Sequence, residues 1–308
     1  MNIFAKQYIK NLVGRYDKEV GIPYFSYKNF EGIHFEPGAF QNSRGVEIHY
    51  FFYYYDNYKN DKIVLFCPGI GPGHTAYLNE INHLAKGGYK VLTLDYTGCG
   101  ESKGEILGSL NMPTLDVIDL LNKFNLKENI VLMGHSLGAY TSLNLLNAIE
   151  GIKKAVIMSG FVTIKDLMKR SLKSGFLANQ ICKYEKETVP EYYGLDNISY
   201  LKTTKDKIFF IQSEDDPVVP FECGYKVYEA ANNPNIKLLK FNNRKHNPNY
   251  TDSAVKYMHK SFAIYRSQIK KKIINTDEDK INYFKNISIE KVTEQDEKLF
   301  GEIIAFID

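Results

Sequence analysis

Ser136 lies in the pentapeptide GHSLG (residues 134–138), whose setting in the sequence favours a nucleophilic serine. The preceding run, 129–133, is apolar and β-rich like a buried parallel strand, and residues 139–146 have helical spacing. A serine on such a sharp strand-to-helix turn presents its hydroxyl clear of the sheet. Glycines two positions before and after the serine are needed because a β-carbon there would strike the neighbouring strand or helix. The pattern predicts a nucleophile elbow, with an ordinary turn as the alternative.

A serine hydroxyl needs a base to remove its proton, and the base needs a carboxylate to orient it. The loop after the predicted strand 207–211 offers three carboxylates, namely Glu214, Asp215 and Asp216. His246 is the only histidine in the loop that follows the next predicted strand, 236–241. His259 lies in a later helical segment, where we expect a solvated or packed role. The chain therefore supplies a serine, an acid and a histidine in that order.

With this order of residues the chain resembles an α/β-hydrolase, close in style to the monoacylglycerol lipase and serine aminopeptidase-like branch. The acid motif of that family usually reads Gly-x-x-Asp-x-x-Val-Pro, and residues 213–220 follow it with a serine in place of the glycine. The resemblance implies Ser136 as nucleophile, His246 as base and Asp216 as acid, with Asp215 as the alternative acid. It covers roughly residues 45–250 and the final helix, and it implies a mostly parallel central sheet with helices on both faces and a helical cap insertion.

The oxyanion that forms during acyl transfer needs hydrogen-bond donors already aimed at it. One donor is expected to be the backbone N–H of Leu137, directly after the nucleophile. The glycine-rich turn 68–74 is placed to supply the second donor. The family usually has His-Gly where this chain has Pro68-Gly69, and by position the resemblance implies the N–H of Ile70. The alternative is that this segment is a plain turn.

Other polar residues near these motifs are expected to be structural. Residues 95–102 resemble the family's Asp-x-Arg-Gly-x-Gly-x-Ser turn, with a threonine where arginine is common. We expect His135 to point into the scaffold, and His74 could line the mouth of the pocket; for both, a structural role is favoured over a chemical one. Four basic residues could face an acidic substrate, but a solvated helix face is favoured for them: Lys165, Lys169, Arg170 and Lys173.

Strand-like and helix-like segments alternate along the chain, which is typical of an α/β protein. Residues 161–203 break the alternation with helix-forming patches and no strand, so we expect a helical cap over the catalytic end of the sheet. The hydrolase core would then comprise residues 45–160 and 204–308, after an N-terminal extension over residues 1–44. Residues 250–290 form a charged excursion from that core.

Both ends of the chain are predicted to form short helices that pack on the body of the protein. In the N-terminal helix, one side could be formed by Ile3, Phe4, Ile9, Leu12 and Val13. Near the C-terminus, Thr293–Asp296 resembles a helix N-cap, and an apolar helical face follows it.

The composition excludes several classes of function. The 308 residues are 44% hydrophobic, enough for a large core, and a net charge of +3 is too small to favour nucleic acid as a partner. The four cysteines are widely spaced, form no metal-ligand pattern and are interpreted as free thiols in a reducing compartment. No apolar run suits a signal peptide or a membrane span. We expect a cytoplasmic protein without stable membrane insertion.

The sequence thus predicts a serine hydrolase that cleaves a carboxylic ester, such as an acyl-glycerol or another small acyl ester, through an acyl-enzyme. Its partner would be a small-molecule acyl substrate, and no metal or organic cofactor is implied. The alternatives on the same triad are a thioesterase, a peptidase or an acyltransferase. An alternative of another class is a non-catalytic binding protein on a hydrolase scaffold. Acyl-chain preference and oligomeric state are left open.

Overall fold

The computed structural model describes residues 3–59 and 62–308, and within them eight strands form one sheet in the order β1-β2-β4-β3-β5-β6-β7-β8. The strands are β1 (His34–Gln41), β2 (Glu47–Tyr54), β3 (Ile63–Cys67), β4 (Lys90–Leu94), β5 (Ile130–His135), β6 (Lys154–Met158), β7 (Lys207–Ser213) and β8 (Ile236–Phe241). The β1–β2 and β2–β4 pairs are antiparallel, and every other neighbouring pair is parallel. The predicted α/β-hydrolase architecture, a mostly parallel sheet with helices, is confirmed.

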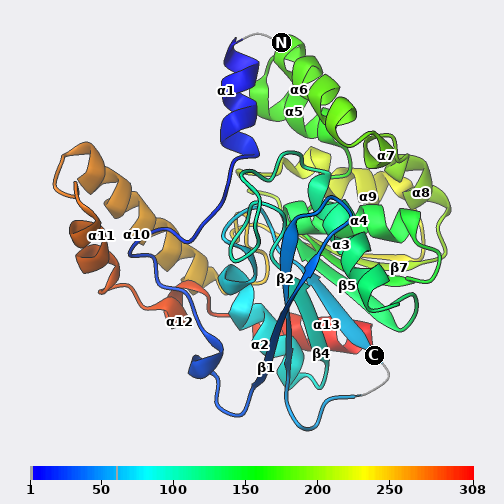
Figure 1. Cartoon of the computed structure of the whole chain (residues 1–308), viewed down its shortest axis with the longest axis horizontal. Helices are drawn as coiled ribbons and strands as arrows, with labels where there is room; N and C mark the ends of the chain where they lie inside the picture. The colour runs from blue at the N-terminus through cyan, green and yellow to red at the C-terminus, as the bar shows by residue number, and fades with distance from the viewer. Residues whose placement is uncertain (1–2, 60–61) are drawn as a thin grey trace.

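Helices cover both faces of this sheet (Figure 1). The helices are α1 (Ile3–Leu12), α2 (Leu78–Lys86), α3 (Met112–Lys123), α4 (Leu137–Ala148), α5 (Ile164–Leu172), α6 (Gly175–Thr188), α7 (Pro190–Tyr193), α8 (Asn197–Thr203), α9 (Tyr225–Ala231), α10 (Asp252–Lys270), α11 (Asp277–Phe284), α12 (Ile289–Val292) and α13 (Glu297–Ile307). Residues of α2 and α13 share one buried core with the sheet, and residues of α3, α4 and α9 share the other. None of the described helices has the length and apolar character to cross a membrane.

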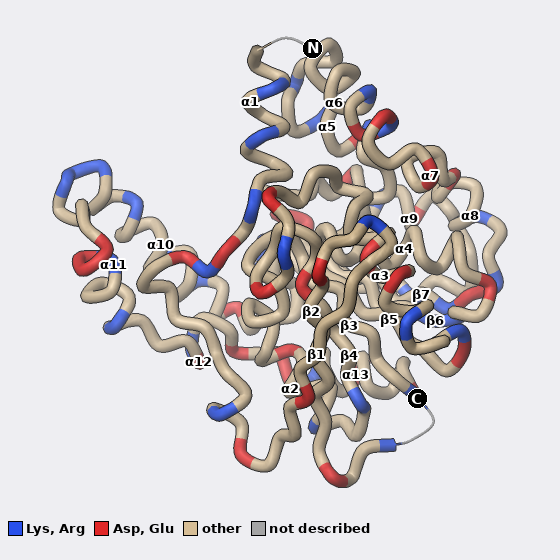
Figure 2. The backbone as a smooth tube through the Cα atoms, in the orientation of Figure 1, with Lys and Arg blue, Asp and Glu red and all other residues tan. Residues whose placement is uncertain are grey.

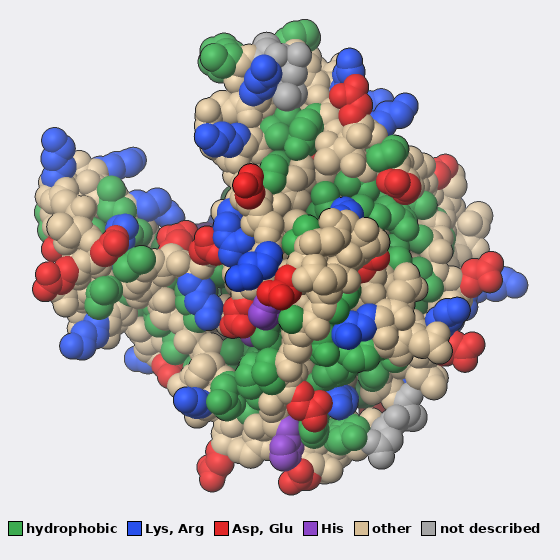
Figure 3. Space-filling model, viewed as in Figure 1, with side chains coloured by type: hydrophobic (Ala, Val, Ile, Leu, Met, Phe, Trp, Pro, Cys, Tyr) green, Lys and Arg blue, Asp and Glu red, His purple; other side chains and the backbone are tan. Residues whose placement is uncertain are grey.

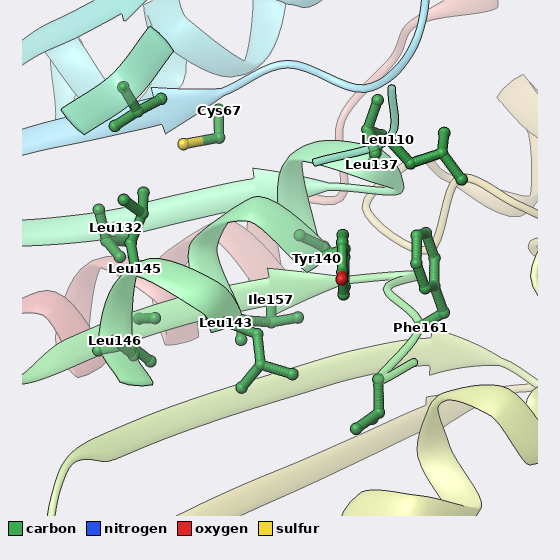
Figure 4. Close-up of a cluster of buried hydrophobic side chains, with 14 of the residues drawn as sticks. Cys67, Leu110, Leu132, Leu137, Tyr140, Leu143, Leu145, Leu146, Ile157 and Phe161 are labelled. Carbon is green, nitrogen blue, oxygen red and sulfur yellow. The ribbon is translucent and has the colours of Figure 1, made fainter. Parts of the chain in front are cut away.

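The central strand β5 explains why the sheet must be covered on both faces. All of its residues are buried, and successive side chains alternate between the two cores. Leu132 packs into the core beneath α4, whereas Val131 and Met133 face α2 and α13. Figure 4 shows Leu132 beside Leu145 of α4 in the first of these cores. Because neither face of such a strand contacts water, its sequence is a nearly continuous apolar run.

The segment 161–203, expected to form a cap, contains α5, α6, α7 and α8 and no strand. Helices α5 and α6 pack against each other, and α1 lies beside α6 (Figure 1). Phe161 and Leu167 of this segment reach the carboxyl ends of the strands, where their side chains line the same cavity as Ser136. The helices therefore stand over the end of the sheet that carries the candidate site.

The excursion between residues 250 and 290 forms an arm built from α10, α11 and α12 (Figure 1). Lysines occupy its outer turn, at residues 270–272, where the backbone tube is blue (Figure 2). Its base is closed by backbone hydrogen bonds from Thr251 N–H to the Glu294 carbonyl, 3.0 Å, and from Asp296 N–H to the Asn249 carbonyl, 2.8 Å. Asp296 then caps α13 by accepting the Leu299 N–H at 3.0 Å, at the end of the predicted N-cap segment.

The predicted apolar side of the N-terminal helix is wrong for two residues. Ile3 and Phe4 are 76% and 74% exposed, whereas Ile9 and Val13 are buried. The buried face also includes Ala5, because residues four apart lie on one side of a helix. The predicted set included large apolar side chains that are exposed and omitted the small side chain of Ala5, which is buried.

Glu185 of α6 is a buried carboxyl that joins the cap to the body. Its carboxyl group accepts the Leu110 N–H at 3.1 Å and the Ser109 hydroxyl. Burial is the largest effect on this group, and it raises the pKa of Glu185 to about 7.

This pKa makes the stability of the protein depend on pH. Because the pKa of Glu185 is higher in the folded state than its ordinary value of 4.5, the contribution is complete at acidic pH and is lost as the pH rises toward 7. We expect the free energy of unfolding to fall by roughly 3 kcal/mol over this window. Glu185→Gln should flatten the dependence in urea unfolding, and Glu187→Gln, exposed on the same helix, should leave it unchanged. Equal slopes for the wild type and Glu185→Gln would contradict the assignment.

Candidate active site

Ser136 occupies a strained turn between β5 and α4. Its φ of 56° and ψ of −117° lie outside the regions that ordinary residues prefer. A β-carbon on Gly134 would meet the carbonyl of Gly138, and one on Gly138 would meet the carbonyl of Cys67. The Ser136 N–H donates to the Met158 carbonyl at 2.9 Å, which ties the turn to β6. The glycines flanking the serine are therefore required for close packing, as the sequence predicts.

Asp216 and His246 meet at the ends of β7 and β8. The Nδ1 of His246 lies 2.8 Å from Oδ2 and 3.0 Å from Oδ1 of Asp216. The backbone N–H groups of Val218 and Val219 donate to Oδ1 of the same carboxylate at 2.8 and 3.0 Å. Its side chain is completely buried. The carboxylate is thus fixed from one side and faces the imidazole with the other.

The other two acids of this loop have different partners. Asp215 accepts the Ser213 hydroxyl at 2.6 Å and pairs with the Lys245 ammonium at 2.9 Å. Glu214 pairs with Lys240 at 2.7 Å. Among the described residues, only Asp216 of the three contacts His246. His259 lies on α10 and lines a separate cavity together with Asp215 and Lys245.

The loop that carries His246 is held by the C-terminal part of the chain. The Arg244 guanidinium pairs with Asp296 at 2.7 Å and with Asp252 at 3.0 Å, and it lies over the ring of Phe241. The Asn249 amide donates to Glu80 of α2 at 3.0 Å. These contacts connect the loop to α2, to the start of the arm and to the cap of α13.

The backbone N–H groups of Ile70 and Leu137 lie near Ser136 and have no hydrogen-bond partner within the described residues. Both residues line the same cavity as Ser136. The turn that carries Ile70 is held by Asp95, which accepts the His74 N–H at 2.7 Å and lies 2.8 Å from the His74 ring. His74 is buried in this contact, which supports a structural role for it.

His135 connects the turn of Ile70 with the loop of His246. Gly69 N–H donates to the Tyr77 hydroxyl at 3.0 Å, and that hydroxyl lies 2.9 Å from Nδ1 of His135. Nε2 of His135 lies 2.7 Å from the carbonyl oxygen of His246. Burial lowers the pKa of His135 to about 3, so its ring is neutral, accepts at Nδ1 and donates from Nε2. The sequence predicts a scaffold position for His135 but gives no signal for Tyr77.

The cavity beside Ser136 has a volume of about 150 Å³ and is almost entirely apolar. It is lined by Tyr8, Leu12, Ile70, Leu110, Ser136, Leu137, Phe161, Leu167, Met168, Ser171, Val218 and Val219. Figure 4 shows Leu110, Leu137 and Phe161 near one another at the end of the buried core. The four basic cap residues noted above are exposed and do not line it, so the solvated-face interpretation fits them. No hydrogen bond joins the Ser136 hydroxyl to His246 within the described residues. The ring of His246 lies near Ser136's neighbour in the chain, with 4.7 Å between the ring centroids of His135 and His246.

Comparisons with a family model and with solved structures agree with the fold described above. Residues 58–198 match the model of the serine aminopeptidase S33 family, which is less than half of the chain. An esterase from Pyrococcus furiosus superposes with a TM-score of 0.58 at 20% identity, covering 83% of this chain and 98% of the esterase. The chain has the α/β-hydrolase fold.

The curated relatives that the chain matches include a lipase and another hydrolase. Lysophosphatidylserine lipase ABHD12 from Rattus norvegicus is 29% identical over 191 residues, which are 56% of this α/β-hydrolase and 46% of the relative. A 2-hydroxy-6-oxononadienedioate/2-hydroxy-6-oxononatrienedioate hydrolase from Escherichia coli is 34% identical over 33% of this chain and 37% of its own length. The chain therefore spans less than half the length of these relatives.

The burial of His135 predicts that its ring does not titrate near neutral pH. Because burial disfavours the imidazolium, we expect the ring to remain neutral from about pH 5 upward, with its proton on Nε2. The ¹⁵N chemical shifts of its ring nitrogens, assigned with a His135→Asn variant, measure this directly. A His135 resonance that titrates between pH 6 and 7 would show that the bridge to His246 is not made as described.

Proposed function

We propose that this α/β-hydrolase cleaves carboxylic esters through an acyl-enzyme on Ser136. The observation that carries the proposal is the Asp216–His246 pair beside a strained serine that opens on an apolar cavity. An ester is favoured over an amide because the curated relatives include a lipase and the superposed structures include esterases. The match to an aminopeptidase family model favours a peptide bond as the alternative substrate.

The reaction begins with attack of the Ser136 hydroxyl on the ester carbonyl. Nε2 of His246 removes the hydroxyl proton, while Asp216 holds Nδ1 and stabilises the imidazolium that forms. The Ser136–His246 hydrogen bond would form on substrate binding, since such contacts are often open without substrate. The N–H groups of Leu137 and Ile70 are free to donate to the oxyanion.

Collapse of the tetrahedral intermediate breaks the bond to the leaving alcohol. The alcohol takes the proton from His246 and leaves the acyl group on Ser136. Water then attacks the acyl-enzyme with His246 again as base, and the products are the carboxylic acid and free Ser136. Asp216 stays ionised throughout and keeps the imidazole in the orientation that both steps require.

The volume of the cavity limits the acyl group. A cavity of about 150 Å³ holds a molecule of roughly six carbons, the size of benzene. Its lining offers apolar contacts and few polar groups, which suits a saturated chain rather than a charged one. We therefore propose acyl chains of about four to six carbons as the preferred group.

The triad is tested by hydrolysis of p-nitrophenyl butyrate with four proteins. We expect Ser136→Ala to abolish turnover and Asp216→Asn to lower kcat by about 10⁴-fold, because the imidazole loses its orienting carboxylate. Asp215→Asn is the matched control, since Asp215 pairs with Lys245 instead, and it should retain kcat within about tenfold. Circular dichroism establishes that each variant is folded.

Two results would overturn the assignment. Full activity of Ser136→Ala would exclude the serine mechanism. Loss of kcat in Asp215→Asn with retention in Asp216→Asn would place the acid one residue earlier in the loop.

A further inference from the structure

The N-terminal helix α1 contributes two side chains to the cavity beside Ser136. Tyr8 and Leu12, one helical turn apart, lie on the same face of α1 and line the cavity together with Leu110 and Met168. Neither of them belongs to the region matched by the family model, residues 58–198. One wall of the cavity therefore comes from a part of the chain outside that match.

The end of α1 that reaches the cavity is firmly attached to the body. Leu107 N–H donates to the Gly14 carbonyl at 3.1 Å, and Gly108 N–H donates to the Val13 carbonyl at 3.0 Å. The Tyr16 hydroxyl donates to the carbonyl of Leu12 itself at 2.7 Å.

Arg15 strengthens this attachment. Its guanidinium donates to the carbonyls of Ser102, Gly104 and Gly100 at 3.1, 2.9 and 3.0 Å. The same loop leads on to Leu110, which also lines the cavity. Leu12 is thus held at a fixed position relative to the rest of the lining.

The remainder of α1 packs on the cap. Ile9 of α1 shares a buried core with Ala178 and Ile181 of α6, and α1 and α6 lie side by side (Figure 1). The outer end of the helix is different, since hydrophobic side chains are exposed there (Figure 3) and Ile3 lies away from the cavity. The contacts that matter to the cavity are therefore confined to the inner half of α1.

We propose that α1 forms one wall of the acyl-binding site and that Leu12 sets the length of the acyl chain. This inference rests on the proposed esterase function of the same site. The ligand class is a straight saturated acyl chain, because the wall presents an isobutyl group and an aromatic ring and no charge. A larger or smaller side chain at position 12 changes the length of acyl chain that fits beyond the Ser136 hydroxyl.

Opposite substitutions at Leu12 should move the preference in opposite directions. Leu12→Ala removes three carbons from the wall, and the ratio of kcat/KM for p-nitrophenyl octanoate over butyrate should rise about tenfold or more. Leu12→Phe fills the space, and the same ratio should fall by a similar factor. A merely structural role of Leu12 would instead lower kcat/KM for all chain lengths together in both variants.

The matched control is Ile3→Ala, an apolar truncation on the exposed end of the same helix, which should leave the ratio unchanged. Binding of alkanoates of four to twelve carbons to the Ser136→Ala protein, measured by calorimetry, reports the same preference without turnover. An unchanged preference in both Leu12 variants would overturn the role of α1. A shifted binding preference in a protein that hydrolyses no ester would support the wall and overturn the proposed function instead.

Discussion

The turn at residues 134–138 is the constraint on which the rest of the site depends. Its backbone is pressed so closely against the end of β3 that a β-carbon on Gly138 would meet the carbonyl of Cys67. This packing holds Ser136 at a φ of 56°, a conformation that only a rigid surrounding can maintain. Strand β5 supplies that rigidity because it is buried on both faces, and its residues pack in the two cores instead of contacting a substrate. The groups that would act with the serine must therefore come from neighbouring loops.

Those loops are positioned by hydrogen bonds and ion pairs that link distant parts of the chain. Tyr77 and His135 connect the turn that carries Ile70 with the backbone of His246. Arg244 fastens the loop of His246 to the cap of α13. The neutral state of His135 suits this role. An imidazolium has a donor on each nitrogen, so its Nδ1–H would repel the Tyr77 hydroxyl proton. Its positive charge would also repel the catalytic imidazolium proposed for His246. The loops around Ser136 are thus held in position by residues other than Ser136, Asp216 and His246.

Much of the fold and the pairing of Asp216 with His246 could be predicted because their signals are local. GHSLG between an apolar strand and a helix specifies a turn, and strands that end in acidic and histidine-bearing loops meet at one edge of a parallel sheet. The choice of Asp216 over Asp215 depended on a motif, since both residues follow the same strand. In the structure Asp216 faces His246, whereas Asp215 faces Lys245.

The contributions of α1 and Tyr77 could not be predicted, because they arise from tertiary packing between segments far apart in the chain. Helical periodicity shows that a short helix has an apolar side, but it does not identify the partner that covers it, and for Ile3 and Phe4 it gave the wrong side. A tyrosine hydroxyl likewise leaves no pattern in the sequence that would indicate His135 as its acceptor.

The most direct test of a nucleophilic serine is the site of covalent modification by a fluorophosphonate probe. The intact mass should increase by one adduct, and peptide mapping should place it on Ser136 rather than on the nearby buried Ser142. The Ser136→Ala protein should remain unmodified under the same conditions. A folded wild-type protein that takes up no probe, or one modified at another serine, would contradict the proposed mechanism.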